Sequence, residues 1–156
     1  MPHYRDHFLE GASGVDLVVA LYDGMIRFLY AAADAVDRGD ETGRRAAVKR
    51  AFDIIIHLQA RLRMDIGGKP AQALSEFYAS IFAQILQASQ SASRPKFEHA
   101  IECIRNVRDA WKQVAAECAD ESSHISSTHA RHLAMHTESQ SKLQQVQAGN
   151  GVSWTA

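Results

Sequence analysis

Four segments of this chain repeat apolar residues at alternating steps of three and four positions, which is the spacing of one face of an α-helix. They predict helices over about 15–38, 41–65, 70–90 and 94–118. The last of the four keeps a nearly heptad spacing throughout. No segment shows the strict alternation that is typical of a β-strand. The pattern therefore predicts an all-α protein.

Short connections separate the predicted helices. Gly39 and Asp40 end the first helix, Gly67 and Pro70 lie between the second and the third, and a serine-rich loop over 89–93 precedes the fourth. Glycine is favoured just after a helix and proline at the start of the next one, so these residues mark helix boundaries. Because short connections make successive helices antiparallel neighbours, the sequence predicts an up-down-up-down four-helix bundle.

The composition of the chain changes near Cys118. We predict that residues 1–118 form one bundle domain with a short N-terminal capping segment, since soluble domains commonly contain about 100 to 200 residues. Over 119–156, Ser, His and Gln dominate and the apolar spacing weakens. This segment has too little apolar surface to order itself alone. We therefore predict a polar, mobile tail that is partly helical, over about Ser127 to Gln147.

Composition excludes several classes of partner and location. With 17 Lys and Arg against 18 Asp and Glu the net charge is -1, so no bulk charge favours nucleic acid or an anionic membrane surface. The sequence contains neither a secretory signal nor a run of about 20 apolar residues that could insert into a membrane. Cys103 and Cys118 fall on one predicted helix about 22 Å apart, which is too far for a disulfide. Free thiols without a targeting segment predict a cytoplasmic protein.

The predicted helices carry more apolar residues than a closed four-helix bundle can bury. Most residues between Val15 and Leu29 are apolar, whereas a core-facing stripe occupies about three positions in seven. Ile54, Ile55 and Ile56 span about 200° of the second helix, so at least one of them must leave the central core. Either another segment of this chain covers the surplus, or a groove is reserved for an amphipathic helix of a partner. The two alternatives are compatible, because a covering segment can move aside for a partner.

The sequence contains no recognisable catalytic apparatus. Nucleophile-elbow, phosphate-loop, dinucleotide and paired-cysteine motifs are absent, which predicts a protein that is not an enzyme and needs no cofactor. His129, His132 and His136 would share one face of a helix, and this spacing can hold Zn²⁺ or Ni²⁺. No acidic ligand of the H-E-x-x-H type accompanies them. We therefore favour a His-rich polar tail over a metal site.

An ordered set of short motifs resembles one known family. The segment from Tyr4 to Leu29 contains Leu-Tyr-Asp-Gly at 21–24, Leu-Arg-Met-Asp-Ile-Gly-Gly follows at 62–68, and Arg-Asp-Ala-Trp-Lys lies at 108–112. In this order and spacing the motifs resemble the flagellar secretion chaperone family FliS. The resemblance covers about positions 4–118 and spans all four predicted helices.

The resemblance implies a cytoplasmic export chaperone that is a monomer or a weak dimer. Its client would be the C-terminal region of flagellin, which it would bind as helices in apolar grooves, keep from premature polymerisation and deliver to the cytoplasmic domain of the flagellar type III export gate. Tyr4 occupies the position that the family uses both to cap the groove and to dock to the gate. The expected partner-binding residues are Tyr4, Phe8, Leu9, Leu21, Tyr22, Met25, Ile55, Ile56 and Leu58.

Two departures from the family pattern lie near the N-terminus. Gly14 stands where the family usually has proline, which loosens the start of the first helix, and Met1 holds the apolar position three before Tyr4, which shortens the capping segment. A structural alternative also fits the apolar surplus, namely an adaptor bundle that homodimerises through that face. A flagellin C-terminal peptide separates the two hypotheses, because a chaperone binds it and an adaptor ignores it.

Overall fold

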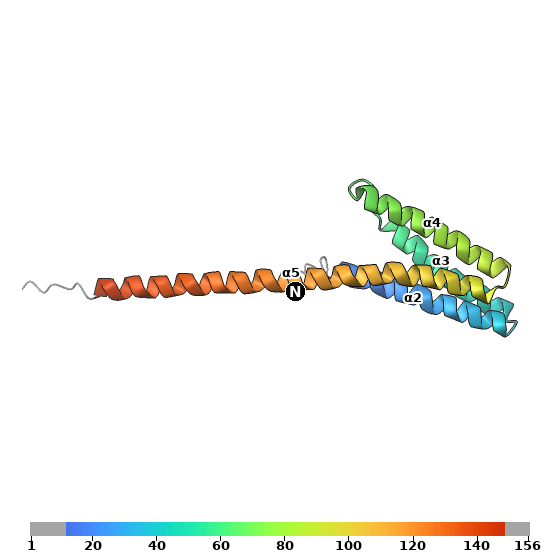
Figure 1. Cartoon of the computed structure of the whole chain (residues 1–156), viewed down its shortest axis with the longest axis horizontal. Coiled ribbons are helices and arrows are strands. Elements are labelled where there is room, and N and C mark those ends of the chain that lie inside the picture. The colour runs from blue at the N-terminus through green and yellow to red at the C-terminus, as the bar shows by residue number, and fades with distance from the viewer. Residues whose placement is uncertain (1–11, 149–156) are drawn as a thin grey trace, which may run out of the picture. The chain divides into compact units, whose positions relative to one another are not determined.

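The computed structural model describes the backbone of residues 12–148 and the side chains of residues 14–135. Within that range it contains helices and no strand (Figure 1). The expected all-α fold and antiparallel helical bundle are confirmed. The helices are α2 (Ala12–Asp37), α3 (Glu41–Ala60), α4 (Gly68–Gln90) and α5 (Arg94–Ala148).

The turn between α2 and α3 follows the predicted boundary. Gly39 has a φ of 67°, a left-handed conformation that glycine adopts without steric cost. The Asp40 carboxylate accepts a hydrogen bond of 2.8 Å from the backbone N–H of Gly43, which caps the first turn of α3. A Cβ on Gly43 would stand 2.2 Å from Oδ2 of Asp40, so the carboxylate would have to turn aside if any other residue were placed there. Local side-chain chemistry thus sets this helix boundary.

The second helix is shorter than predicted. α3 ends at Ala60 rather than near residue 65, and the connection to α4 folds into turns. Within this connection Arg63 donates two hydrogen bonds to the Asp65 carboxylate, at 3.1 and 3.0 Å. Met64 and Ile66 keep the apolar spacing of the helix before them, but both are exposed. Periodicity alone could not separate an exposed apolar turn from a further turn of helix.

The hydrophobic core lies where α2, α3, α4 and the first part of α5 face one another. Gly24 of α2 lies against α3: a Cβ added there would stand 3.4 Å from Cδ1 of Ile54, an ordinary van der Waals contact, so the packing does not itself require glycine. Large side chains fill the centre, and those that are fully buried are Tyr22, Met25, Leu29, Ile81, Ile85, Phe97, Ile101 and Ile104. The apolar stripes of the four predicted helices therefore meet in one core.

The fourth helix is longer than predicted. α5 continues to Ala148, whereas the fading apolar spacing placed its end near Cys118. Over 119–148 the sequence contains neither Gly nor Pro, so it lacks the residues that stop a helix most strongly. By its contacts the chain divides into one unit up to Ala115 and a second from Ala116 onward. The core described above belongs to the first unit.

The remaining expectations about the chain concern its N-terminus, its thiols and membranes. The predicted capping segment falls on residues 1–11, which lie outside the described residues. Cys103 is half-buried, Cys118 is exposed, and both are free thiols, as predicted. No helix in the described part of the chain is long and apolar enough to span a bilayer.

Candidate functional site

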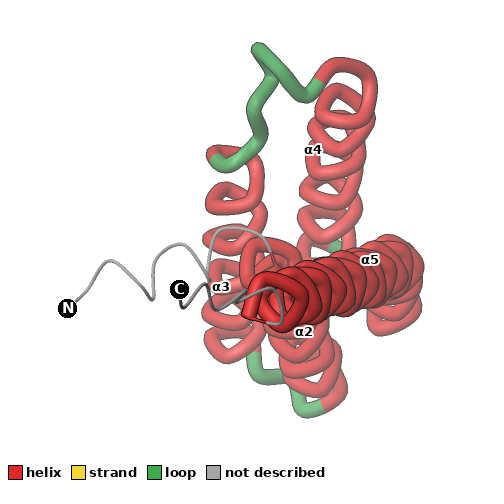
Figure 2. Tube along the Cα trace, turned by 90° about the vertical axis from the view of Figure 1, so that its left-hand side faces the viewer, coloured by secondary structure: helices red, strands yellow, loops and turns green. Residues whose placement is uncertain are grey.

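A groove of about 620 Å³ lies between α3 and α4 in the first unit. Figure 2 shows these two helices side by side, joined by the connection that follows Ala60. Each helix supplies one wall, because the turn between them is short and folds α4 back along α3. The residues that line the groove are Ile55, Ile56, Gln59 and Ala60 of α3, and Ser75, Tyr78, Ala79 and Phe82 of α4.

The walls of the groove are mainly apolar, and no Asp, Glu, Lys, Arg or His lines them. Ile56 is 60% exposed on the α3 wall. On the α4 wall Phe82 stacks against the ring of Phe52, with the ring centroids 4.1 Å apart. The amide of Gln59 donates a hydrogen bond of 2.8 Å to the Ser75 hydroxyl across the two helices. Such a surface suits the apolar face of a guest helix better than a small charged ligand.

Tyr78 forms the floor of the groove, and a second tyrosine, Tyr22, anchors it to the core. The hydroxyls of Tyr78 and Tyr22 lie 2.9 Å apart and share a hydrogen bond that joins α4 to α2. Burial raises the pKa of Tyr22 far above its usual value, the hydrogen bond with Tyr78 raises it further, and a smaller hydrogen-bonding contribution from Trp111 opposes the rise. Burial also raises the pKa of Tyr78. Both phenols therefore stay neutral and keep the floor rigid at ordinary pH.

Exposed apolar side chains extend the surface beyond the groove itself. Leu86 lies one turn after Phe82 on α4 and is exposed. Met64 and Ile66 are exposed in the connection between α3 and α4. The α3–α4 hairpin therefore exposes further apolar side chains besides those that line the groove.

The structure places the predicted partner-binding residues in three different environments. Ile56 lies on the groove wall, and Ile55 is buried at the groove's base. Leu21 is half-buried and packs against the core. Three of them lie inside the core, namely Tyr22, Met25 and Leu58. A partner cannot reach these side chains unless the bundle opens. Outside the described residues fall Tyr4, Phe8 and Leu9.

Sequence reasoning missed the wall that α4 contributes. Phe82, Ala79 and Ser75 line the groove, yet the periodic pattern assigned α4 only its inward stripe. A signal was present, since Ile81 and Phe82 are adjacent and about 100° apart on a helix, so both cannot lie at the centre of one narrow stripe. The argument used for Ile54, Ile55 and Ile56 of α3 applies equally to Ile81 and Phe82 of α4. It would have identified Phe82 as a residue at the edge of the core.

Two motifs that carry the family resemblance meet across α2 and α5, outside the groove. Arg108 of α5 donates a hydrogen bond of 2.9 Å to the Asp23 carboxylate of α2. This carboxylate is the main cause of the raised pKa of Arg108. Next to them Trp111 of α5 reaches the hydroxyl of Tyr22. The motifs at 21–24 and 108–112 therefore hold these two helices together.

A metal centre finds no support in the described side chains. No group of three or more His, Cys, Asp or Glu residues among them could hold a metal ion. His129 and His132 are exposed on α5, and the side chain of His136 lies outside the described set. The groove between α3 and α4 is therefore the better candidate for a functional site.

Comparisons with known proteins agree in pointing to one family. A family model described as flagellar protein FliS matches residues 1–118. A flagellar secretion chaperone FliS of Vibrio cholerae is 32% identical over 112 residues, which cover 72% of this chain and 82% of that protein. A protein of the same description from Salmonella typhimurium is 30% identical over 109 residues, 69% of this chain and 81% of that protein. One from Bacillus subtilis is 24% identical over 110 residues, 70% of this chain and 81% of that protein.

Proposed function

The chain belongs to the FliS family of flagellar secretion chaperones, and on that basis we propose that it binds the C-terminal region of flagellin in the groove between α3 and α4. Members of this family are chaperones and not enzymes. In the proposed role the protein acts in the cytoplasm. It keeps bound flagellin from premature polymerisation and delivers it to the cytoplasmic domain of the flagellar export gate.

The apolar, uncharged groove beside Ile56 is the observation that carries this proposal. A disordered client that folds on binding must offset its ordering cost by burying apolar surface, at about 25 cal/mol per Å². Ile56 and Phe82 offer such surface on opposite walls, and the rigid tyrosine floor needs no rearrangement to receive a helix. The client is therefore bound as an amphipathic helix whose apolar side chains enter the groove.

The N-terminal residues have a separate role in this proposal. Tyr4, Phe8 and Leu9 form an apolar set that covers the groove when it is empty and moves aside for the client. Tyr4 then takes part in docking to the export gate. The support for this role is the match of Tyr4 to the family pattern together with the exposed groove that needs a cover.

The groove assignment is tested by the substitution Ile56→Asp, with His57→Asp as the matched control. Both side chains are exposed on α3, but His57 does not line the groove. We expect Ile56→Asp to weaken binding of a flagellin C-terminal peptide at least about tenfold, because a carboxylate must be desolvated against the guest helix. His57→Asp should bind like the native chain. Isothermal titration calorimetry measures the affinities, and thermal melts followed by circular dichroism report whether both variants remain folded.

If the folded Ile56→Asp chain bound the peptide with native affinity, this groove would be excluded as the client site. Equal weakening by both substitutions would point to a general effect of charge on α3. Ile55→Asp is unsuitable for this test, because Ile55 is buried and a carboxylate there would destabilise the bundle itself.

A further inference from the structure

The groove between α3 and α4 is apolar except at one place. Three of the residues that line it carry a polar side-chain group, namely Gln59, Ser75 and Tyr78. The hydroxyl of Tyr78 is already engaged with that of Tyr22. Gln59 is exposed on α3 and Ser75 is half-buried on α4. These two side chains, the Gln59–Ser75 pair, therefore supply the polar groups that a guest in the groove meets.

The Gln59–Ser75 pair uses only part of its hydrogen-bonding capacity. The side-chain N–H of Gln59 donates a hydrogen bond of 2.8 Å to the Ser75 hydroxyl. A carboxamide also has a second N–H and an oxygen that accepts, and a serine hydroxyl has its own O–H to donate. Within residues 14–135 the structure gives neither side chain another hydrogen bond. The carboxamide oxygen of Gln59 and the O–H of Ser75 are thus left for water or for a bound partner.

A guest helix that lies in the groove displaces water from this pair. A buried polar group that loses its partner weakens binding, so a guest with an unbroken apolar face is disfavoured here. A guest Asn or Gln side chain can donate to the Gln59 oxygen and accept from the Ser75 O–H at the same time. The chemistry of the pair therefore favours a carboxamide.

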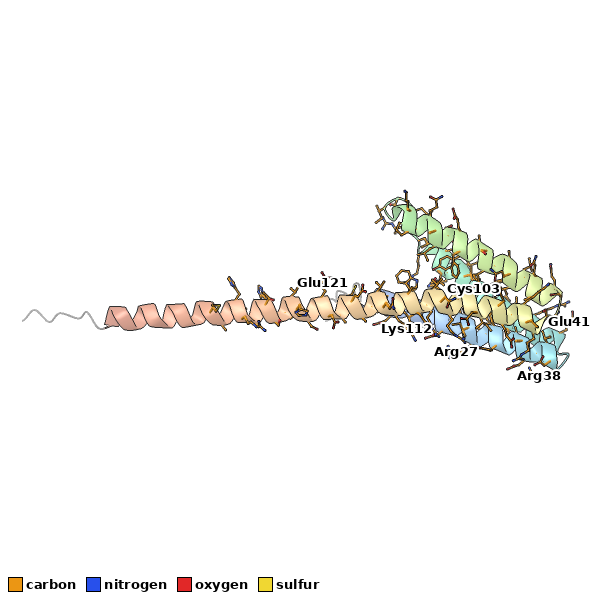
Figure 3. All side chains as sticks on the ribbon, viewed as in Figure 1. Arg27, Arg38, Glu41, Cys103, Lys112 and Glu121 are labelled. Carbon is orange, nitrogen blue, oxygen red and sulfur yellow. The ribbon has the colours of Figure 1, made fainter. Side chains whose placement is uncertain are left out.

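A charged guest side chain would find no counter-ion among the lining residues, since none of them is Asp, Glu, Lys, Arg or His. An ion pair of α3, between Glu41 and Arg45, lies at the other end of the helix. Figure 3 labels Glu41, which begins α3 about 27 Å along the helix from Gln59. Burying an unpaired charge costs far more than burying a carboxamide that is hydrogen-bonded. A neutral amide is therefore favoured over a carboxylate or an ammonium group.

The position of the pair along the groove sets the spacing that a guest must have. On α3, Ile56 precedes Gln59 by three residues, or about 4.5 Å of helix. On α4, Phe82 follows Ser75 by seven residues, or about 10.5 Å. Because α3 and α4 are antiparallel, both apolar side chains lie on the same side of the pair. A guest helix along the groove therefore has its carboxamide three or four residues from one apolar side chain and seven from a second.

We propose that the Gln59–Ser75 pair sets the specificity and the register of the client helix. It binds a single Asn or Gln side chain on an otherwise apolar face. The guest donates one hydrogen bond to the Gln59 oxygen and accepts one from the Ser75 O–H. A shift of the guest by one turn would bring an apolar side chain onto the pair and leave both groups unpaired. This inference rests on the proposed function and adds to it the chemistry by which the groove recognises its client.

A double-mutant cycle between chain and peptide tests the proposal. Each Asn and Gln of a flagellin C-terminal peptide is replaced in turn by Leu, and isothermal titration calorimetry measures binding to the full-length chain. One replacement should weaken binding about tenfold, because it leaves the pair unsatisfied. In the variant Gln59→Met with Ser75→Ala the same replacement should change the affinity less than about twofold, since the groups that it would leave unpaired are gone. If no replacement is coupled to the pair in this way, the proposal is overturned.

The matched control is the variant Gln72→Met with Ser80→Ala. Both residues are exposed on α4, and neither lines the groove. Each takes part in one side-chain hydrogen bond, Gln72 with Glu76 at 3.4 Å and Ser80 with Gln84 at 3.3 Å, so the control removes the same chemical groups. This variant should keep the native response to the peptide replacement. Thermal melts followed by circular dichroism report whether both double variants are folded.

The substitution Gln59→Glu tests the same chemistry in a chain that keeps a polar side chain at this position. A carboxylate accepts hydrogen bonds and donates none. A peptide with Lys at the position identified by the replacements should therefore bind the Gln59→Glu chain at least about tenfold more tightly than it binds the native chain. Equal binding of this peptide to the two chains would contradict the proposal.

The Ile56→Asp variant separates a failure of this inference from a failure of the proposed function. If Ile56→Asp weakens peptide binding while the variants of the pair leave every peptide preference unchanged, the groove remains the client site and the pair has no role in specificity. If Ile56→Asp also leaves binding unchanged, the groove assignment and this inference are both wrong.

Discussion

The hydroxyl groups of Tyr22 and Tyr78 link the α3–α4 groove to the bundle core. Tyr22 is 0% and Tyr78 3% exposed, so neither hydroxyl can turn to bulk water for a hydrogen bond. Each finds a partner in the other, at 2.9 Å. Buried polar groups that are fully paired restrict the ways in which helices can pack. The pair therefore fixes the register of α4 on α2, and with it the position of the groove floor.

Removing one of these two hydroxyls should lower the stability of the fold by more than the net contribution of the hydrogen bond itself. We expect Tyr22→Phe or Tyr78→Phe alone to lower the free energy of unfolding by about 1 to 2 kcal/mol, because each breaks the hydrogen bond between two buried hydroxyls. The double variant should lose less than the sum of the two single losses. Urea denaturation of the four proteins measures this coupling. Strict additivity would mean that the two hydroxyls act independently.

The same pair predicts a loss of stability at high pH. Burial raises the pKa of Tyr22 and of Tyr78 in the folded chain, while an unfolded tyrosine ionises near about pH 10. The stabilisation is thus fully present below about pH 10 and is lost as the pH rises further, since only the unfolded state releases these protons easily. We expect the native chain to lose about 1 kcal/mol more per pH unit above pH 10 than the double Phe variant. Melting temperatures between about pH 8 and 11 check this, and parallel curves for the two proteins would contradict it.

At the scale of elements, the α3–α4 hairpin carries the candidate client groove. Both helices have one stripe in the core, and each keeps a second set of apolar residues at the edge of that stripe. The edges face one another because the turn after Ala60 brings α4 back along α3. Stacking of Phe52 on Phe82 then holds the two walls at a fixed separation. The groove is a property of the pair of helices and belongs to neither alone.

Filling the groove should block the client without harming the fold. Ala79 is exposed on the groove wall, so Ala79→Phe places a ring in the space that the guest helix needs. We expect flagellin peptide affinity to fall about tenfold or more while the melting temperature stays near the native value, because no core contact is lost. Ala73→Phe on the same helix is the control, since Ala73 is exposed outside the groove. If the folded Ala79→Phe chain bound the flagellin peptide as tightly as the native chain does, the client site would have to lie outside this groove.

At the scale of the whole molecule, two independent divisions of the chain nearly coincide. The family match ends at residue 118, and the contacts divide the chain after Ala115. The first unit holds the described core and the α3–α4 groove, and the second contains the remainder of α5. Chaperone activity is therefore expected to reside in the first unit.

Truncation after Cys118 tests this expectation. A chain of residues 1–118 should keep its melting temperature within about 3 °C of the full protein and bind the flagellin peptide within about twofold, because every described core and groove residue remains. Circular dichroism and calorimetry measure the two quantities. Unfolding of the shortened chain would show that the second unit contributes to the stability of the first, contrary to the division by contacts.

The amino-acid sequence by itself determined, for residues 12–148, the number of helices, their order and their antiparallel arrangement, and it also determined the family. These features follow from local information. A 3.6-residue period, the Gly39–Asp40 turn and the short motifs at 21–24 and 108–112 can each be recognised without knowing what packs against them. Local information also has limits, since it extended α3 through the exposed Met64 and stopped α5 near Cys118.

Only the tertiary structure decided which apolar residues are buried and which are exposed. Ile55 and Ile56 are identical side chains on adjacent positions, yet the first is 4% exposed and the second 60%. Tyr22 and Met25, expected to touch the client, lie in the core, whereas Phe82 of α4 forms a groove wall that periodicity did not reveal. The reason is that an apolar side chain is buried by whatever helix lies over it, and that neighbour comes from a distant part of the chain.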